Sequence, residues 1–281
     1  MTANQNMTRW FFALMSAAVF VGAAERLKTA PRQTAAQEIQ VALPLFVQVF
    51  MAAGDRFLAA NLATIRALIV ATDKMRPEDY RILAKVQEDA SWLNPAHEDN
   101  YYAATAILPW NGELDAAQTI LARATKARYF DYQPAFYYAF HLLHFKGDAV
   151  GASEWMRAAA EKLPSEDERL TMQNIAARWM DRAQDIDLAI RIVEGMAQQA
   201  KRKDFRAYLE QRVVRLRALK ALRQAALLYQ QRFGRSLVKL TDLVDSGLVG
   251  SIPADPFGFG FDVDKRGQIV LRTSPPLPPK Q

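Results

Sequence analysis

The first feature of the chain is a run of fifteen uncharged residues, Trp10 to Ala24, which ends before Glu25. At about 1.5 Å of rise per residue, a helix over this run covers roughly 22 Å, less than the roughly 30 Å hydrocarbon core of a bilayer. The run ends in small residues, 21–24, which suit cleavage by signal peptidase. Residues 1–34 are therefore expected to be an anchor or signal segment. The alternatives are a tilted single-pass helix with aromatic and basic flanks, or a cleaved signal peptide.

From residue 35 to residue 166, apolar residues recur at helical spacing and no alternating strand pattern is present. The breaks are short and carry Pro, Gly or Asp. Alanine recurs at Ala90, Ala124 and Ala159, at intervals of 34 and 35 residues. Two antiparallel helices of about 12 to 14 residues with their turns fill such an interval, and alanine suits the points where helix backbones come closest. The pattern predicts an all-α region of stacked helical hairpins.

Three other sets of positions keep a fixed distance from these alanines. A small or aliphatic residue lies seven positions before each alanine, and a turn residue followed by an acidic residue lies twelve positions before it. A Pro or Tyr lies five positions after each alanine. In that order, the three sets are Leu83, Ala117 and Ala152; Glu78, Gly112 and Gly147; and Pro95, Tyr129 and Pro164. In these respects the chain resembles the tetratricopeptide repeat family, and three units are expected, at 64–97, 98–132 and 133–166. The resemblance implies a helical solenoid. The sequence departs from the family pattern at Phe140, where a small residue is usual, and at Pro109, which interrupts the second unit.

In tetratricopeptide solenoids, the first helix of each unit lines a concave groove, so the resemblance implies a groove that docks a protein partner. The aligned side chains are the rigid, amphipathic kind that anchor peptides. They are Tyr102, Trp110, Tyr137, His141, His144 and Phe145. The alternative is that half of them pack against neighbouring helices. The groove lacks the Lys and Asn set with which chaperone-binding members clamp a carboxylate, so that class of partner is not expected.

Residues 167–235 contain no proline and are expected to form long helices, the last of them a basic helix that caps the repeats. Residues 201–235 carry eleven basic side chains against two acids, a net charge of +9, whereas the whole chain has +6. We expect this basic surface to contact anionic lipid or an acidic protein rather than nucleic acid, the alternative being a solvated polar face. Its central residues are Arg212, Arg215, Arg217, Lys220 and Arg223.

Residues 236–281 are rich in Gly and Pro and are expected to form a short helix, a β-hairpin and a Pro-rich tail. The segment resembles the C-terminal portion of type II secretion pseudopilins, although no prepilin-cleavage signal leads into it. That resemblance implies, as an alternative function, a component of a secretion or pilus-type assembly. The matching residues are Tyr229, Gly234, Arg235, Leu240, Leu243, Pro253, Asp255, Pro256, Phe257 and Gly258.

Candidate catalytic chemistry is sparse. With Cys 0 and His 3, the chain has no thiolate ligand or nucleophile and few candidates for hydrolase or zinc chemistry. No P-loop, dinucleotide-binding fingerprint, HExxH or G-x-S-x-G motif is present. His141 and His144, with Asp148 one turn further, lack an evident third ligand for a metal. We expect neither an enzyme nor a bound cofactor or metal.

Together these features predict an all-α, tetratricopeptide-like protein of the bacterial cell envelope that acts as a membrane-tethered scaffold. Its partners would be proteins of an envelope complex, with membrane contact through the N-terminal segment. We expect a single-pass inner-membrane protein with most of the chain in the periplasm. The alternative is a soluble periplasmic protein after signal cleavage.

Overall fold

The computed structural model describes residues 3–29, 41–70 and 75–272. The chain divides into two compact units, residues 1–38 and 39–281. Helix α1 (Ala3–Thr29) belongs to the first unit and contains the uncharged run. The boundary expected at residue 34 and the Pro-rich tail both lie outside the described residues.

The second unit is mostly helical, with a small antiparallel sheet near its C-terminal end. This confirms the expected helical class and the C-terminal β-hairpin. Its α-helices are α2 (Leu45–Met51), α3 (Arg56–Leu68), α4 (Pro77–Leu93), α5 (Glu98–Ile107), α6 (Leu114–Ala127), α7 (Gln133–His141), α8 (Ala149–Ala160), α9 (Glu166–Trp179), α10 (Ile186–Gln199), α11 (Lys203–Phe233) and α12 (Thr241–Asp245). Short turns extend three of them: the 3-10 turns η2 (Pro109–Asn111) and η4 (Met180–Arg182), and the π-helical turn η3 (Leu142–Lys146). The strands are β1 (Phe261–Val263) and β2 (Ile269–Leu271).

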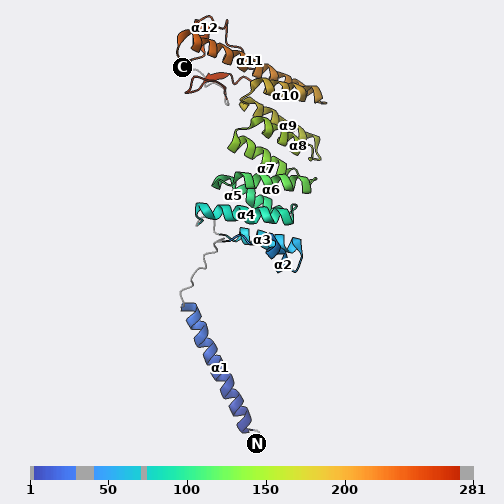
Figure 1. Ribbon diagram of the computed structural model, residues 1–281, viewed down its shortest axis with the longest axis vertical. Coiled ribbons are helices and arrows are strands. Elements are labelled where there is room, and N and C mark those ends of the chain that lie inside the picture. Colours follow the sequence, from blue (N-terminus) through green and yellow to red (C-terminus); the bar gives the residue numbers. More distant parts are fainter. Residues whose placement is uncertain (1–2, 30–40, 71–74, 273–281) are drawn as a thin grey trace. The chain divides into compact units, whose positions relative to one another are not determined.

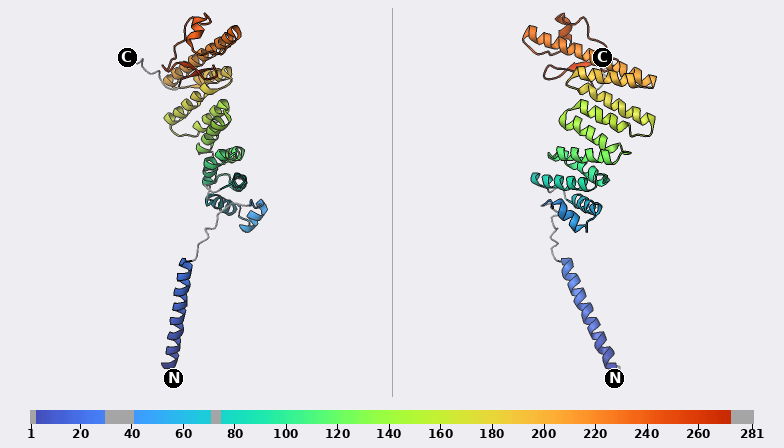
Figure 2. Two further views of the ribbon diagram at one scale, coloured as in Figure 1. Left: turned by 90° about the vertical axis from the view of Figure 1, so that its left-hand side faces the viewer. Right: turned by 45° about the vertical axis from the view of Figure 1, so that its right-hand side comes forward.

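The helices of this unit are stacked in chain order, as Figure 1 and the turned views of Figure 2 show. Helix α5 packs on α6 and α7 packs on α8, so these pairs coincide with the intervals expected at 98–132 and 133–166. The expected start of the first unit at residue 64 is wrong, because α3 already begins at Arg56 and packs on α4. Asp55 starts α3 early: its Oδ1 accepts hydrogen bonds from the amides of Phe57 and Leu58.

Beyond residue 166, the expectation of long helices holds for α11, with 31 residues, but not for α9 and α10, which have 14 each. No Pro or Gly marks the break between these two helices. Instead, the Asp185 carboxylate caps α10 by accepting a hydrogen bond from the Leu188 amide at 2.9 Å. Ser165 caps α9 in the same way. Polar caps, rather than helix breakers, divide this part of the chain.

The repeated small residues lie where the helices cross. Ala90, Ala124 and Ala159 are buried, and so are the residues seven positions before them. Each triplet occupies equivalent places on α4, α6 and α8. Five of these six positions are alanine, which lets neighbouring helices pack closely, whereas Leu83 fills the sixth. The spacing that predicted the hairpins therefore has a direct packing role.

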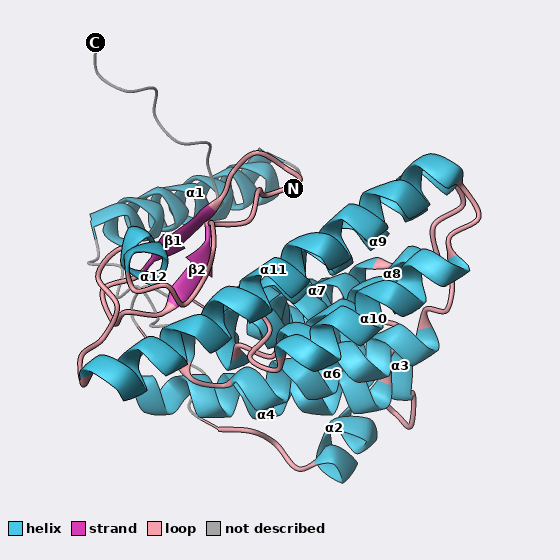
Figure 3. Cartoon of the chain, turned by 90° about the horizontal axis from the view of Figure 1, so that it is seen from above, coloured by secondary structure: helices cyan, strands magenta, loops and turns pink. Residues whose placement is uncertain are grey.

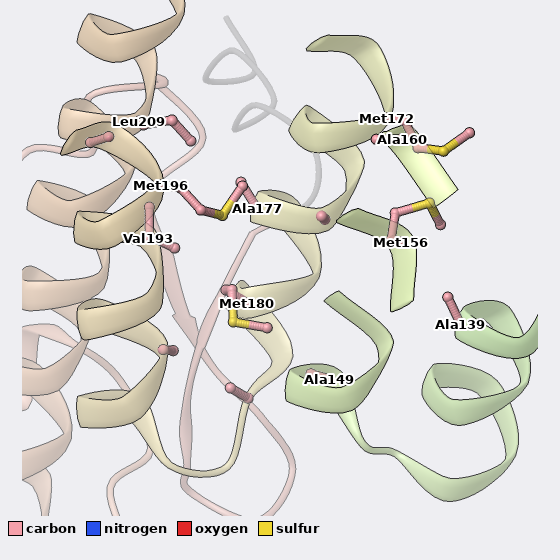
Figure 4. Packing of buried hydrophobic residues seen from close by; sticks show 14 of the residues in the cluster. Ala139, Ala149, Met156, Ala160, Met172, Ala177, Met180, Val193, Met196 and Leu209 are labelled. Atoms are coloured by element: carbon pink, nitrogen blue, oxygen red, sulfur yellow. The ribbon is translucent and has the colours of Figure 1, made fainter. Parts of the chain in front are cut away.

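The core towards the C-terminal end adds methionines to the alanines that also line the preceding core. Figure 4 shows Met156, Met180 and Met196 pointing into the space between α8, α9 and α10, with Leu209 of α11 closing the cluster. The flexible thioether side chains fill gaps that the small residues leave between these helices. Helices α8 to α11 thus share one core.

Helix α11 is joined to the C-terminal element by a separate core. Leu219, Leu222 and Tyr229 of α11 pack with Leu243 of α12 and Phe261 of β1. The strands pair antiparallel, with Phe261 opposite Leu271, and the hairpin lies beside α12 in Figure 3. The C-terminal element is therefore an integral part of the second unit.

Candidate partner-binding surface

Two irregular turns place the predicted aromatic residues. Trp110 lies in η2, which ends at Gly112 with a φ of 87°. His144 and Phe145 lie in η3, which ends at Gly147 with a φ of 66°. Only glycine adopts this left-handed conformation without strain, so the two turn glycines seen in the sequence fix the ends of both segments.

Four rings from these two segments and α7 form what we call the aromatic surface: Trp110, Phe140, His144 and Phe145. The Trp110 ring centroid lies 5.1 Å from that of His144 and 4.9 Å from that of Phe145. Phe140 stacks on His144 at 5.3 Å. Trp110 is 59% exposed and His144 is also exposed. The structure thus brings together residues some 35 positions apart in sequence, with Trp110 and His144 exposed and Phe140 and Phe145 half-buried beside them.

The predicted tyrosines are less accessible. The rings of Tyr102 and Tyr137 lie 5.9 Å apart, and both are half-buried against the core of α3 to α6. The Tyr102 hydroxyl donates a hydrogen bond to Oε1 of Gln133. Burial raises the pKa of the Tyr137 hydroxyl. These two residues border the aromatic surface and also belong to the packing between α5 and α7.

His141 does not face a partner. Its side chain is buried, and its Nε2 lies 3.0 Å from the Thr105 hydroxyl of α5. Burial lowers the pKa of the imidazole to about 4, so the ring is neutral at pH 7. Its ring contacts Phe145 at 5.7 Å. The expectation of a partner-binding His141 is wrong because the ring supports the aromatic surface from below.

Two of the five central residues of the predicted basic surface are not on a surface. Arg212 and Arg215 are buried. The Asp181 carboxylate of η4 accepts a hydrogen bond from each guanidinium group, at 2.6 and 3.3 Å. Arg215 also pairs with Asp255 of the C-terminal element at 3.1 Å. Both guanidinium groups lie over the ring of Phe257. The positive charges are retained inside the protein because buried carboxylates pair with them.

The other three basic residues also have partners. Arg217 pairs with Glu194 at 2.6 Å and Lys220 with Asp187 at 2.5 Å, both across the contact between α10 and α11. Arg223 donates from Nε to the carbonyl oxygen of Ile269 in β2 at 3.1 Å. These contacts hold α11 against its neighbours. Sequence reasoning missed them because every partner lies at least 23 residues away.

A cleft that sequence reasoning missed lies between α8, α9 and α10, with a volume of about 410 Å³. Its lining includes the basic residues Arg157, Arg169 and Arg202 and the acidic residue Glu161. Much of this charge is engaged, since Arg202 pairs with Asp167 and Asp204 and Arg169 donates to the Leu163 carbonyl oxygen. The lining also includes Glu166 and Lys201, so the cleft is polar.

Among the described residues, no three acidic or His side chains gather to form a metal site. Within the same ranges, no individual helix is both long and apolar enough to cross a membrane, although α2 and α3 meet the criteria as a bent pair. No protein family, curated protein or solved structure matches this chain.

Proposed function

We propose that the chain is a membrane-tethered scaffold that binds a protein partner through the aromatic surface. The observation that carries the proposal is the convergence of Trp110, His144 and Phe145 from two separate segments into one group of rings, of which Trp110 and His144 are exposed. Large aromatic side chains of this kind supply much contact area at low entropic cost and dominate binding energies at interfaces.

The support beneath these rings favours a pre-formed site. The buried pair of Thr105 and His141 joins α5 to α7 directly under Phe145. The left-handed turn glycines fix the ends of η2 and η3. A surface held in this way loses little conformational entropy when a partner binds.

The stacked pairs of helices are consistent with the tetratricopeptide-like solenoid that the sequence predicts. In that family, the aligned first helices of the units line the concave groove, and α5 and α7 occupy those places. We propose that an extended or helical segment of an envelope protein docks along them. The uncharged run in α1 would tether the scaffold to the inner membrane as a single-pass anchor, with most of the chain in the periplasm. Cleavage of that segment would instead give a soluble periplasmic protein.

The alternative, a secretion or pilus-type component acting through its C-terminal segment, has less support. Asp255 and Phe257, which carry much of the resemblance to pseudopilins, face inward. Asp255 pairs with the buried Arg215, and Phe257 lies against Arg212 and Arg215. These motif residues therefore attach the element to α11 and are not displayed for contacts between subunits.

Photo-crosslinking tests the binding surface in the full-length protein in cells. A photoreactive phenylalanine analogue at Phe145 is expected to capture a discrete protein. The same analogue at Phe130, a phenylalanine that is 62% exposed at the opposite end of α7, is expected not to capture it. Capture from Phe145 should fall when Trp110→Ala is added. Equal capture from both positions, or no loss with Trp110→Ala, would contradict the proposal.

A further inference from the structure

Helix α3 has an unusual distribution of side chains, because its small residues face inward and its large apolar residues face outward. The buried positions are Ala59, Ala60, Ala63, Thr64 and Ala67. The large apolar side chains of the helix and its end are between 44% and 55% exposed: Phe57, Leu58, Leu62, Ile65, Leu68 and Ile69. A helix whose outer face contacts water normally carries polar residues on that face. This distribution indicates that something apolar covers α3.

Helix α2 also carries large exposed apolar side chains. Phe46, Phe50 and Met51 are 75%, 83% and 68% exposed. A bend of 106° separates α2 from α3, at Ala53 and Gly54, which have φ values of 53° and 86°. We call the exposed apolar side chains of the two helices the α2–α3 apolar face. It comprises nine residues: Phe46, Phe50, Met51, Phe57, Leu58, Leu62, Ile65, Leu68 and Ile69.

The few charges of this segment are engaged, and one of them, the Arg56 guanidinium, lies over the Phe57 ring of the apolar face, 5.2 Å from its centroid. Residues 41–70 contain only Asp55, Arg56 and Arg66 as charged side chains. Asp55 caps α3, Arg56 donates to the Leu93 carbonyl oxygen at 2.7 Å, and Arg66 donates to the Val41 carbonyl oxygen. A surface that binds a protein partner normally has a polar rim around an apolar centre. The scarcity of such charges favours hydrocarbon as the covering medium, because one long basic side chain can still reach the headgroup level.

The position of the face in the chain favours the same medium. Only residues 30–44 separate α1 from α2. Fifteen residues span at most about 50 Å when fully extended, so the α2–α3 apolar face stays close to any membrane that holds α1. At about 1.5 Å per residue, α3 is roughly 20 Å long, too short to cross the hydrocarbon core but long enough to lie along its boundary. Apolar helices of this kind bury one face at the level of the acyl chains.

We propose that the α2–α3 apolar face lies in the interfacial layer of the membrane that holds α1. This inference rests on the proposed tether and adds a second, peripheral contact that fixes which end of the stack meets the bilayer. The hydrophobic surface of the nine side chains is then removed from water, which a contact through α1 alone does not explain.

The chain has no cysteine, so single cysteine substitutions can carry a spin label on the full-length protein without background. Three positions are needed: Leu62→Cys on the face, Val19→Cys in α1, and Ala158→Cys on α8 as an exposed control. The protein is reconstituted in vesicles of phosphatidylethanolamine and phosphatidylglycerol. Collision rates with oxygen and with a water-soluble nickel chelate are then measured. We expect the oxygen-to-nickel ratio at Leu62→Cys and Val19→Cys to exceed that at Ala158→Cys severalfold.

The outcomes separate this inference from the proposed tether. A high ratio at Val19→Cys with a control-like ratio at Leu62→Cys keeps the tether and overturns the inference. A high ratio at Leu62→Cys with an aqueous Val19→Cys supports the lipid contact and overturns the tether. Dipolar broadening at Leu62→Cys before lipid is added would show that a second copy covers the face, and this would also overturn the inference. Circular dichroism of each labelled variant checks that it is folded.

Discussion

Polar side chains inside the helical stack are held by partners from neighbouring helices. The Lys162 ammonium group, which follows α8, donates to the carbonyl oxygens of Thr125, Arg128 and Asp131. The Tyr101 hydroxyl of α5 donates to Asp131 at 2.8 Å. These bonds fasten one helical pair to the next at the turn between α6 and α7. Each joins residues at least 30 positions apart, so the sequence alone gives no sign of them.

His141 provides a test of this internal packing through pH. Its pKa is about 4 in the folded protein and near 6.5 when unfolded, so between these values the unfolded chain binds more protons. The stabilisation from a neutral His141 is therefore complete above pH 6.5 and is lost as the pH falls towards 4. At 1.36 kcal/mol per pH unit, the loss is about 3 kcal/mol. Urea unfolding of the full chain across this range measures it.

The matched variants for this test are His141→Gln and His144→Gln. Glutamine at residue 141 can still accept from Thr105 but does not titrate, so the loss of stability between pH 6.5 and pH 4 should shrink. The exposed His144 serves as the control, and His144→Gln should keep most of the loss. An unchanged pH dependence in His141→Gln would show that the buried imidazole is not its source.

At the scale of elements, the order and pairing of the helices between α5 and α8 could be predicted because they depend on local signals, but α5 and α7, with 10 and 9 residues, are shorter than expected. Alanine spacing located the crossings, and Gly112 and Gly147 located the turns. The break between α9 and α10 could not be located in the same way, because an Asp cap forms it without Pro or Gly. Asp residues occur at many surface positions where no helix starts, so an Asp alone was too weak a signal to predict this break.

Attachment of the C-terminal element to α11 includes a buried ion pair beside the shared apolar core. Asp255 and Arg215 are almost fully buried and lie 3.1 Å apart, and the Asp255 carboxylate also accepts from the amides of Phe259 and Gly260. Asp255→Ala leaves the Arg215 charge with less compensation, so we expect a loss of about 3 to 5 kcal/mol in the free energy of unfolding. Chemical denaturation followed by circular dichroism measures this loss.

The control for that variant is Asp262→Ala. Asp262 pairs with Arg272 at the same distance, 3.1 Å, but both side chains are exposed to solvent. Its removal should cost less than about 1 kcal/mol. Equal effects of the two substitutions would mean that burial does not set the strength of the Arg215 pair, and the internal role assigned to the basic residues would be wrong.

At the scale of the whole molecule, the sequence predicted the order of regions better than it predicted their surfaces. Helical pairs, a long basic helix and a terminal hairpin follow one another as expected. Which face each residue occupies was harder to foresee, because a helical position can turn inward or outward. Arg212 and Arg215 are buried, whereas Phe50 and Leu62 are exposed. Periodicity alone identifies the apolar side of a helix only when the large residues face the core, and α3 reverses that rule.

The same difficulty affected the aromatic surface, which was predicted only in part. The alignment of repeats assigned Trp110, His144 and Phe145 to one groove, and the structure shows the Trp110 ring in contact with the other two. It also selected His141, which lies beneath them. The π-helical turn η3 alters the helical register after His141, so the spacing of three residues between the two histidines does not keep them on one exposed face.

The measurement that tests the account most directly is the affinity of the captured partner for two tryptophan variants, determined by titration calorimetry. Trp110 and Trp92 are nearly equally exposed, at 59% and 60%, but only Trp110 belongs to the aromatic surface. A central aromatic anchor contributes about 2 kcal/mol or more, so Trp110→Ala should weaken binding by at least about thirtyfold. Trp92→Ala should leave the dissociation constant unchanged. If both variants bind as the unaltered protein does, or both weaken alike, the aromatic surface is not the binding site.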